Sequence, residues 1–220
     1  MGTETGKAGR LKHDEAIRRV QESCDDLIRI ITRDHIPPVS CRAGCDWCCR
    51  QPVYITPLEG VAIRDFVTRN RMEKRVLRET ERYLAEVGAK RQGPSGLAAL
   101  HKSVLGVGPP PTDRQRHAVY GPKCIFLNPD GLCSIYPARP LMCREHISFD
   151  DVRKCERDEP FLGLDKPRFS EVTSYLTQRS VEPRLRMLPI WEYERAAALA
   201  DAAPEVKPGE LKKALRWKTG

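Results

Sequence analysis

Cysteine is the residue type whose spacing in this chain points most clearly to chemistry. Four of the nine cysteines fall within nine consecutive positions, in the stretch CRAGCDWCC: Cys41, Cys45, Cys48 and Cys49. Thiolates spaced this closely can converge on one metal ion or cluster while little chain between them has to be ordered. In a reducing compartment, a disulfide framework is the wrong interpretation of such a group. We therefore expect at least three of the four thiols to ligate a metal.

Four further cysteines lie downstream at wider spacings that only a folded chain could bring together: Cys124, Cys133, Cys143 and Cys155. We expect the first three to be ligands, whereas Cys155 fits a ligand and an ordinary surface or core thiol equally well. The ninth cysteine, Cys24, lies on the apolar stripe of a predicted helix, where a free cysteine behaves as a small buried hydrophobic residue. Eight thiols therefore form the candidate ligand set.

The adjacent pair Cys48 and Cys49 limits how these thiols can be shared. Neighbouring side chains point about 100° apart on a helix and to opposite faces of a strand. One member of the pair therefore reaches a second site or is not a ligand. Eight candidates could build two four-thiolate sites, or one cluster with a structural remainder, and the spacing does not choose between these arrangements.

Two metal chemistries suit a site made of thiolates alone. Zinc is tetrahedral and redox-silent, whereas an iron–sulfur cluster favours all-cysteine ligation and can carry electrons. Of the five histidines, only His146 lies close to a cysteine in the sequence, and we expect it to lie outside the ligand set. We therefore favour an iron–sulfur cluster of the 4Fe–4S type, with zinc as the alternative cofactor.

Four thiolates around a zinc ion or an oxidised four-iron cluster leave a negative site that nearby cations would stabilise. Basic residues flank the cysteines throughout: Arg42, Arg50, Lys123, Arg139 and Arg144. They account for part of the formal net charge of +8, which results from 38 basic and 30 acidic residues. The other basic residues are spread over predicted helix faces with little aromatic interleaving, so we expect no nucleic-acid partner.

The sequence argues against several other classes of protein. No apolar run approaches the roughly 18–20 residues of a membrane-spanning helix, and the polar start lacks the apolar core of a signal peptide. We therefore expect a cytoplasmic protein without membrane contact. No Ser-His-Asp signature, phosphate loop or HExxH motif is present, so no catalytic residue is assigned and enzymatic activity stays an open question. If the chain carries an iron–sulfur cluster, we expect its partner to be a redox protein or an enzyme.

The elements that must position these thiols are mainly helices. From Leu11 onward the chain carries an apolar stripe of helical period: Ile17, Val20, Cys24, Leu27, Ile28 and Ile31. A Pro-Pro pair at 37–38 stops this helix. After the first cysteine group, Thr56 and Glu59 form a capping box around Pro57, which predicts a long helix to about residue 87 with a break near residue 70.

The second cysteine region predicts a β-hairpin. In CIFLNPDGLCSIY, the Asn-Pro-Asp-Gly segment fits a type I turn that ends on a glycine able to take a positive φ. If Leu127 pairs with Leu132, then Cys124 and Cys133 share one face as diagonal neighbours about 7–8 Å apart. That distance is within reach of one metal site.

Together these elements predict an α+β fold, mainly α: a helical domain with one small β-hairpin, organised around a cysteine-ligated metal centre. Residues 1–10 form a disordered tail, and residues 11–165 form the cysteine-cluster metal-binding domain. Within it, the Gly/Pro-rich residues 88–123 form a mobile connector or a lid, interrupted by a short helix over about 97–104. Residues 166–220 form a C-terminal helical extension with a basic tail. Further helices are expected in RPLMCREH and at about 170–179 and 189–201.

Three stretches, in this order, resemble the YkgJ-type cysteine-cluster family, which is also described as a zinc- or iron-chelating domain with a CxxxCxxCC signature. They are CRAGCDWCCRQPVYITPLEG, CIFLNPDGLCSIYPARPLMCR and the separate Cys155. With the helix between the first two, the resemblance covers about residues 15–160. It implies little about a substrate, but it implies binding of a metal or iron–sulfur cluster through a set of seven cysteines: Cys41, Cys45, Cys48, Cys49, Cys124, Cys133 and Cys143.

A competing pattern uses the same first cysteines. CRAGCDWC also resembles the CxxxCx(aromatic)C loop of radical S-adenosylmethionine enzymes, in which three cysteines hold a four-iron cluster. That fold needs repeated strand–helix units after the loop, whereas a predicted long helix and a Gly/Pro-rich segment follow here. A Gly-Gly-Glu-like segment for the cofactor amine is also missing, so radical chemistry is the weaker alternative.

Overall fold

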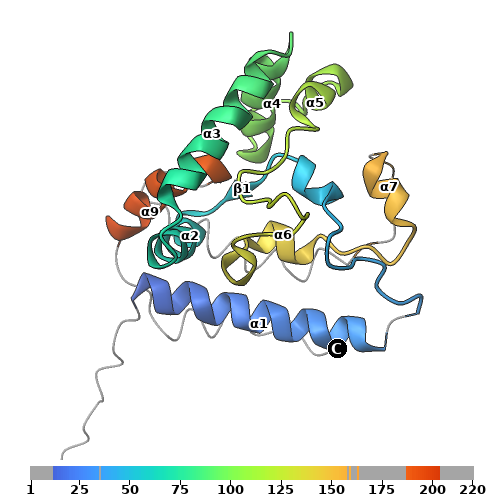
Figure 1. Cartoon of the computed structure of the whole chain (residues 1–220), viewed down its shortest axis with the longest axis vertical. Helices are drawn as coiled ribbons and strands as arrows, with labels where there is room; N and C mark the ends of the chain where they lie inside the picture. The colour runs from blue at the N-terminus through green and yellow to red at the C-terminus, as the bar shows by residue number, and fades with distance from the viewer. Residues whose placement is uncertain (1–11, 35, 158, 160–162, 164–186, 204–220) are drawn as a thin grey trace, which may run out of the picture.

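Helices dominate the structure (Figure 1), a computed structural model that describes residues 12–34, 36–157, 159, 163 and 187–203. One two-stranded antiparallel sheet is found among these residues. The prediction of a mainly helical chain with a small β component is therefore confirmed. No helix in this part of the chain is long and apolar enough to cross a membrane.

The first predicted helix is α1 (His13–Arg33), which runs along one side of the molecule (Figure 1). Its apolar stripe is buried, with Ile28 and Ile31 partly so, and Cys24 within the stripe is 0% exposed, as expected for a cysteine that acts as a hydrophobic side chain. The stripe packs together with residues of α2 (Pro57–Arg69), α6 (Leu141–Glu145) and α9 (Tyr193–Asp201). This first core cluster therefore ties the beginning of the chain to the helix that carries Cys143.

The long helix predicted after the first cysteine group is two helices, α2 and α3 (Glu73–Gly88), and the break falls at the predicted place. α2 begins with the predicted capping box. The Thr56 hydroxyl accepts a hydrogen bond from the Glu59 N–H (3.3 Å), and the Glu59 carboxylate accepts one from the Thr56 N–H (2.7 Å). α2 ends before Asn70, and Arg71 takes a φ of +54°, so the chain leaves the helical conformation there.

α9 packs against α2 so closely that a glycine is required at the contact. A Cβ atom on Gly60 would lie 2.5 Å from the Cβ of Ala196 and 2.7 Å from the backbone nitrogen of Ala197. The helix predicted over residues 189–201 is therefore present, although it begins at Tyr193. Its packing on α2 makes the C-terminal part of the described chain a component of the core.

The sheet joins two segments that are far apart in the sequence. β1 (Tyr54–Ile55), which follows the first cysteine group, pairs with β2 (Leu188–Pro189), and a 3₁₀ turn, η4 (Ile190–Glu192), leads from β2 into α9. Both residues of β1 are buried. The sequence analysis does not predict this pairing, because a two-residue strand carries no alternating pattern to recognise.

Residues 88–123 are more helical than their Gly and Pro content indicates. α4 (Gly93–Val104) contains the predicted short helix and extends it at its N-terminal end, where Pro94 stands in the first turn. The sequence analysis misses α5 (Asp113–Val119), although Thr112 and Gln115 form a capping box that could have indicated it. α4 contacts both α3 and α5.

The predicted β-hairpin over residues 124–136 is reduced to one antiparallel bridge between Leu127 and Cys133. The turn itself forms as expected, since Gly131 takes a φ of +79° and its N–H donates to the Asn128 carbonyl oxygen (3.0 Å). The predicted register is wrong by one residue, because Leu127 lies opposite Cys133 and not Leu132. Inside this bridge the Asn128 N–H donates to the Leu132 carbonyl oxygen (2.8 Å), which leaves a three-residue loop over 129–131 that ends on the left-handed glycine and suits the twist of a hairpin.

The remaining elements are short. α6 matches the helix expected in RPLMCREH, whereas α7 (Val152–Glu156), which carries Cys155, is not predicted. The helix expected at about 170–179 lies outside the described residues. The domain boundaries at residues 165 and 166 also lie outside them and stay a prediction.

Candidate metal centre

The eight candidate thiols lie on four segments. The first segment is a loop that carries Cys41 and Cys45 and continues into the 3₁₀ helix η1 (Trp47–Arg50), which carries Cys48 and Cys49. The second is the turn region over residues 121–133, and the third and fourth are α6 and α7. η1 contacts α7, and Figure 1 shows η1 between α7 and the central part of the molecule. The structure must therefore hold four short segments in place.

Backbone hydrogen bonds join the first segment to the second. The Cys124 N–H donates to the carbonyl oxygen of Cys49 (2.8 Å), and the Gly121 N–H donates to that of Arg50 (2.9 Å). These two bonds lie at the end of η1, where helical carbonyl groups need partners outside the helix. They place Cys49 and Cys124 side by side, although 75 positions separate the two residues in the sequence.

Two glycines allow a close approach between the same two segments. Gly44 has a φ of +83° and Gly131 a φ of +79°, a conformation that other residues adopt only with strain. A Cβ atom on Gly131 would lie 3.0 Å from the carbonyl oxygen of Gly44 and 3.4 Å from its Cα atom. The turn that precedes Cys133 is therefore in contact with the turn that precedes Cys45.

Ser148 links the start of the first segment to the chain before α7. Its carbonyl oxygen accepts hydrogen bonds from the Ser40 N–H (2.9 Å) and the Ser40 hydroxyl (2.8 Å), and its own N–H donates to the Cys41 sulfur (3.3 Å). Ser148 is 0% exposed, and α7, which carries Cys155, begins four residues after it. A buried serine that the sequence analysis does not single out therefore contacts one candidate ligand and lies close in sequence to the helix that carries another.

α6 is held by a buried carboxylate and a buried guanidinium. The Glu59 carboxylate, 2% exposed, accepts a hydrogen bond from the Leu141 N–H (2.7 Å) in addition to its bonds within the capping box. Arg144, also 2% exposed, donates to the carbonyl oxygens of Arg139 (2.9 Å) and Pro137 (2.7 Å) and forms an ion pair with Asp25 of α1. These contacts fix the helix that presents Cys143.

Burial is the largest influence on most of these thiols. It raises the pKa of Cys124 to about 12 and that of Cys143 well above its ordinary value. Burial likewise raises the pKa of Cys133, of Cys155 and of Cys41, and at Cys41 the Ser148 N–H opposes the rise because it favours the thiolate. A metal that binds here would replace protons that the free thiols hold tightly.

The central thiol of the group is Cys48. A hydrogen bond between the two neighbouring thiols lowers the pKa of Cys48 and raises that of Cys49. The charge of Cys48 also raises the pKa of Cys41 on its own segment and of thiols from the three other segments, in addition to the effect of burial: Cys124, Cys133, Cys143 and Cys155. Cys45 has the same effect on Cys41 and Cys155. The structure therefore brings all eight thiols within electrostatic reach of the group.

Among the cations expected near the thiols, Arg139 influences both cysteine regions. Burial raises the pKa of Cys41 and Cys133, and the Arg139 guanidinium acts in the opposite direction on both. This guanidinium lies 4.0 Å from the centre of the Tyr136 ring. Arg144, which also forms the ion pair with α1 described above, acts in the same direction on Cys133.

The chemistry of the donor set fits a thiophilic metal, but the thiols do not form a finished cage. All eight cysteines are free thiols, and His146 is the one imidazole that lies close to a cysteine in the sequence. Within the described residues, no three His, Cys, Asp or Glu side chains are arranged to hold a metal ion. Metal binding would therefore have to draw the side chains of the four segments closer together.

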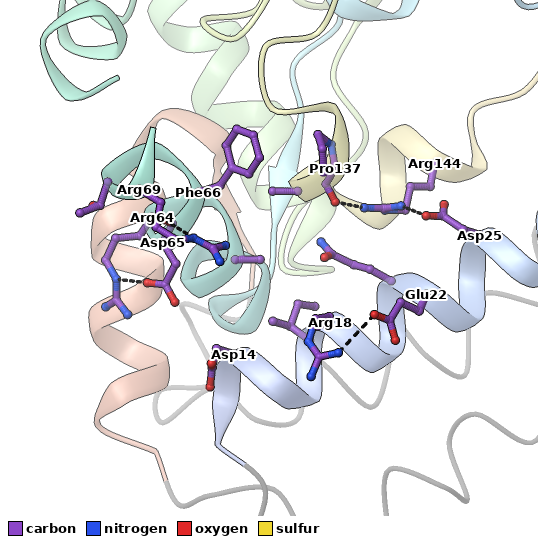
Figure 2. A pocket seen from close by; sticks show the side chains of 15 residues that line it. Asp14, Arg18, Glu22, Asp25, Arg64, Asp65, Phe66, Arg69, Pro137 and Arg144 are labelled. Carbon is purple, nitrogen blue, oxygen red and sulfur yellow. Dashed lines mark hydrogen bonds and ion pairs between the residues drawn. The ribbon is translucent and has the colours of Figure 1, made fainter. Parts of the chain in front are cut away.

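A separate pocket of about 730 Å³ lies between α1, α2 and the 3₁₀ turn η2 (Tyr136–Ala138), as Figure 2 shows. Three ion pairs neutralise much of the charge of its lining: Arg18 with Glu22 (3.3 Å), Arg64 with Asp65 (3.1 Å) and Arg144 with Asp25. No cysteine lines this pocket. It is therefore not part of the candidate metal centre, although Arg144 borders both.

Comparison with known proteins places these cysteines in a family. A protein-family model with the signature CxxCxxCC, described as "Putative zinc- or iron-chelating domain", matches residues 40–160. The match contains all eight candidate ligands and more than half of the chain. Searches of curated proteins and of solved structures found no match. This chain, with its eight gathered thiols, therefore belongs to the CxxCxxCC family of zinc- or iron-chelating domains.

Proposed function

We propose that this chain carries an iron–sulfur cluster of the 4Fe–4S type and that it transfers electrons or supports an enzyme partner in a reducing cytoplasm. The donor set is the observation that carries the proposal. Eight free thiols lie on four segments, the charge of Cys48 acts on thiols of the other three segments, and a ligand set made of cysteine suits iron–sulfur clusters. All eight are proposed ligands: Cys41, Cys45, Cys48, Cys49, Cys124, Cys133, Cys143 and Cys155.

The residues of this chain have definite roles in that proposal. A bound iron–sulfur cluster supplies one-electron transfer. The cysteine thiolates hold it, and the Arg139 guanidinium offsets part of their negative charge. The Ser148 N–H, 3.3 Å from the Cys41 sulfur, is a hydrogen-bond donor of the kind that stabilises a thiolate and shifts the reduction potential of a cluster.

A second candidate function is a structural zinc site in an interaction module. The observation in its favour is the packing of Cys124, Cys133 and Cys143 against the second core cluster, which includes Ile125, Phe126 and Ile135 among others. Structural zinc sites are closed, four-coordinate and coupled to folding, and thiols packed against a core suit that role. A zinc-bound protein would be redox-silent.

The radical S-adenosylmethionine alternative receives no support from the fold. In the part of the chain that the structure describes, the one sheet has two antiparallel strands, and the cysteine loop is followed by β1 and then by helices. A fold of repeated strand–helix units would instead require parallel strands with helical crossovers.

The test of the proposed function is elemental and acid-labile sulfide analysis, with an absorption spectrum, on full-length protein purified without oxygen. We expect about four irons per chain with matching sulfide, and broad visible absorption that dithionite bleaches. Cys48→Ser/Cys49→Ser should lose iron and colour, whereas Cys24→Ala should keep both, because Cys24 is buried in the first core cluster. Zinc without sulfide would favour the structural alternative. Protein that retains no metal would contradict both functions.

A further inference from the structure

The eight thiols divide into two groups of four. We call Cys49, Cys124, Cys133 and Cys143 the inner set, and Cys41, Cys45, Cys48 and Cys155 the outer set. The division follows backbone contacts and packing, whereas the electrostatic effect of Cys48 reaches thiols of both sets, and each set draws its members from segments that are distant in the sequence. It addresses the choice between one shared site and two sites, which the spacing of the cysteines leaves open.

The inner set lies against the core. The backbone hydrogen bond from Cys124 to the carbonyl of Cys49 (2.8 Å) joins η1 to the turn region. The Leu127 N–H donates to the Cys124 carbonyl oxygen (3.0 Å), and Leu127 bridges to Cys133, so one residue connects two inner cysteines. Cys124, Cys133 and Cys143 all pack against the second core cluster. The thiols of Cys124 and Cys143 also act electrostatically on that of Cys49.

The outer set gathers around Ser148 and α7. The Ser148 N–H donates to the Cys41 sulfur (3.3 Å), and α7, which carries Cys155, begins four residues after Ser148, so Cys41 and the helix of Cys155 lie next to the same serine. α7, which carries Cys155, contacts η1, which carries Cys48. The thiols that act electrostatically on Cys155 are those of Cys41, Cys45 and Cys48, which are the three other members of the set.

The division falls between two adjacent residues because of the local backbone. Cys48 and Cys49 lie on a 3₁₀ helix, in which successive side chains point about 120° apart. The two side chains therefore leave the backbone in different directions, although their thiols share a hydrogen bond, and they cannot complete the same tetrahedral site with equal ease. The Cys49 carbonyl is bound to Cys124 of the inner set, whereas η1 meets the outer set through α7.

We propose that this chain holds two thiolate metal centres, an inner one formed by Cys49, Cys124, Cys133 and Cys143 and an outer one formed by Cys41, Cys45, Cys48 and Cys155. The inference rests on the proposed metal-binding function and assigns its number of centres and their ligands. Each set offers four thiolates, which match a thiophilic ion such as Zn²⁺ or one four-iron cluster. The inner centre is the structural one, because three of its ligands pack against the core, and the outer centre exchanges metal more readily.

The experiment uses Zn²⁺ as the probe, whichever metal the purified protein contains. Reduced full-length apoprotein is titrated anaerobically, zinc per chain is counted by native mass spectrometry, and release to a chromogenic chelator is followed in time. We expect two ions per chain, with one released faster. Cys45→Ser/Cys155→Ser should keep a single, slowly released ion. Cys133→Ser/Cys143→Ser is the reciprocal variant and should keep the single, faster-released ion. Cys24→Ala is the control and should keep both ions.

Three results would overturn the two-centre inference: wild-type protein that saturates at one ion, an outer-set variant that still binds two, or an outer-set variant that loses both ions together. The outer-set variant decides the question even if the inner-set variant fails to fold. The proposed iron–sulfur function fails separately, when protein purified without oxygen contains zinc and no sulfide while the titration still gives two centres.

Discussion

The contact between the Gly44 and Gly131 turns can be disrupted by one substitution, and a matched control shows how much of the effect is backbone strain alone. Gly131→Ala introduces a Cβ atom where φ is +79° and where that atom would lie 3.0 Å from the carbonyl oxygen of Gly44. Gly106→Ala is a matched control, because Gly106 also has a positive φ, +67°, but no atom lies within 4 Å of a Cβ there. Both variants incur backbone strain, and only the first pushes the cysteine segments apart.

The magnitudes follow from these two terms. A side chain in the left-handed region costs roughly 1–2 kcal/mol, and this is the whole effect expected at Gly106. Overpacking costs about 1–3 kcal/mol, and we take about 1 kcal/mol at Gly131 because Gly44 has to move by only a small distance. The expected loss of unfolding free energy is therefore about 2–3 kcal/mol for Gly131→Ala and about 1–2 kcal/mol for Gly106→Ala. A difference of about 1 kcal/mol corresponds to roughly fivefold weaker metal binding.

The assay combines urea unfolding, followed by circular dichroism, with competition between each variant and a zinc chelator. Gly131→Ala should lose more stability than Gly106→Ala and should bind Zn²⁺ about fivefold more weakly. Equal stability losses together with equal zinc affinities would refute the reasoning. They would mean that the Gly44–Gly131 contact does not help to assemble the candidate metal centre.

Further predictions concern the surroundings of the site. Arg144→Met leaves two carbonyl groups without their buried donor, so it should lower the free energy of unfolding, measured in urea, by about 3–5 kcal/mol. Asp25→Asn changes a side chain that is 41% exposed and should lower this free energy by about 1 kcal/mol or less. Equal losses in the two variants would contradict the assigned role of Arg144. Gly60→Ala should lower the melting temperature, because the new Cβ atom would collide with the backbone of α9. Gly88→Ala should be neutral or stabilising, because no atom lies within 4 Å of a Cβ there. A higher melting temperature for Gly60→Ala would disprove the tight α2–α9 packing. Zinc affinity, measured by competition with a chelator, should rise with pH and continue to rise above pH ~9. The reason is that the metal replaces the thiol protons, and burial raises the pKa of Cys124 to about 12. An affinity that does not change with pH would contradict ligation by buried thiols.

Local signals in the sequence predict the larger helices well. The apolar stripe of α1, the capping box at Thr56 and the break near Asn70 all depend on residues within a few positions of one another. Such short-range interactions act before the chain folds, so they can be recognised without the tertiary structure. The same kind of signal exists at Thr112, where Gly and Pro nearby conceal a capped helix.

The register of the turn region shows where local signals stop. The Asn-Pro-Asp-Gly segment predicts the turn, and Gly131 does take a positive φ. Leu127 pairs with Cys133 instead of Leu132 because Gly131 belongs to the loop as an extra residue after the turn. The ladder in which Cys124 and Cys133 would be diagonal neighbours is therefore not formed, although the two thiols still lie within electrostatic reach of each other.

The sequence by itself determined that the chain is rich in closely spaced thiols, mainly helical, and a member of a cysteine-cluster family, because these properties depend on residue type and short spacing. The tertiary structure alone decided which thiols become neighbours. The hydrogen bond that joins Cys49 to Cys124, the contact of Gly44 with Gly131, and the hydrogen bond from Ser148 to Cys41 all link residues far apart in the chain. Such contacts form only when the packing of α1, α2, α6 and α9 has already compensated the entropy of closing the long loops between them.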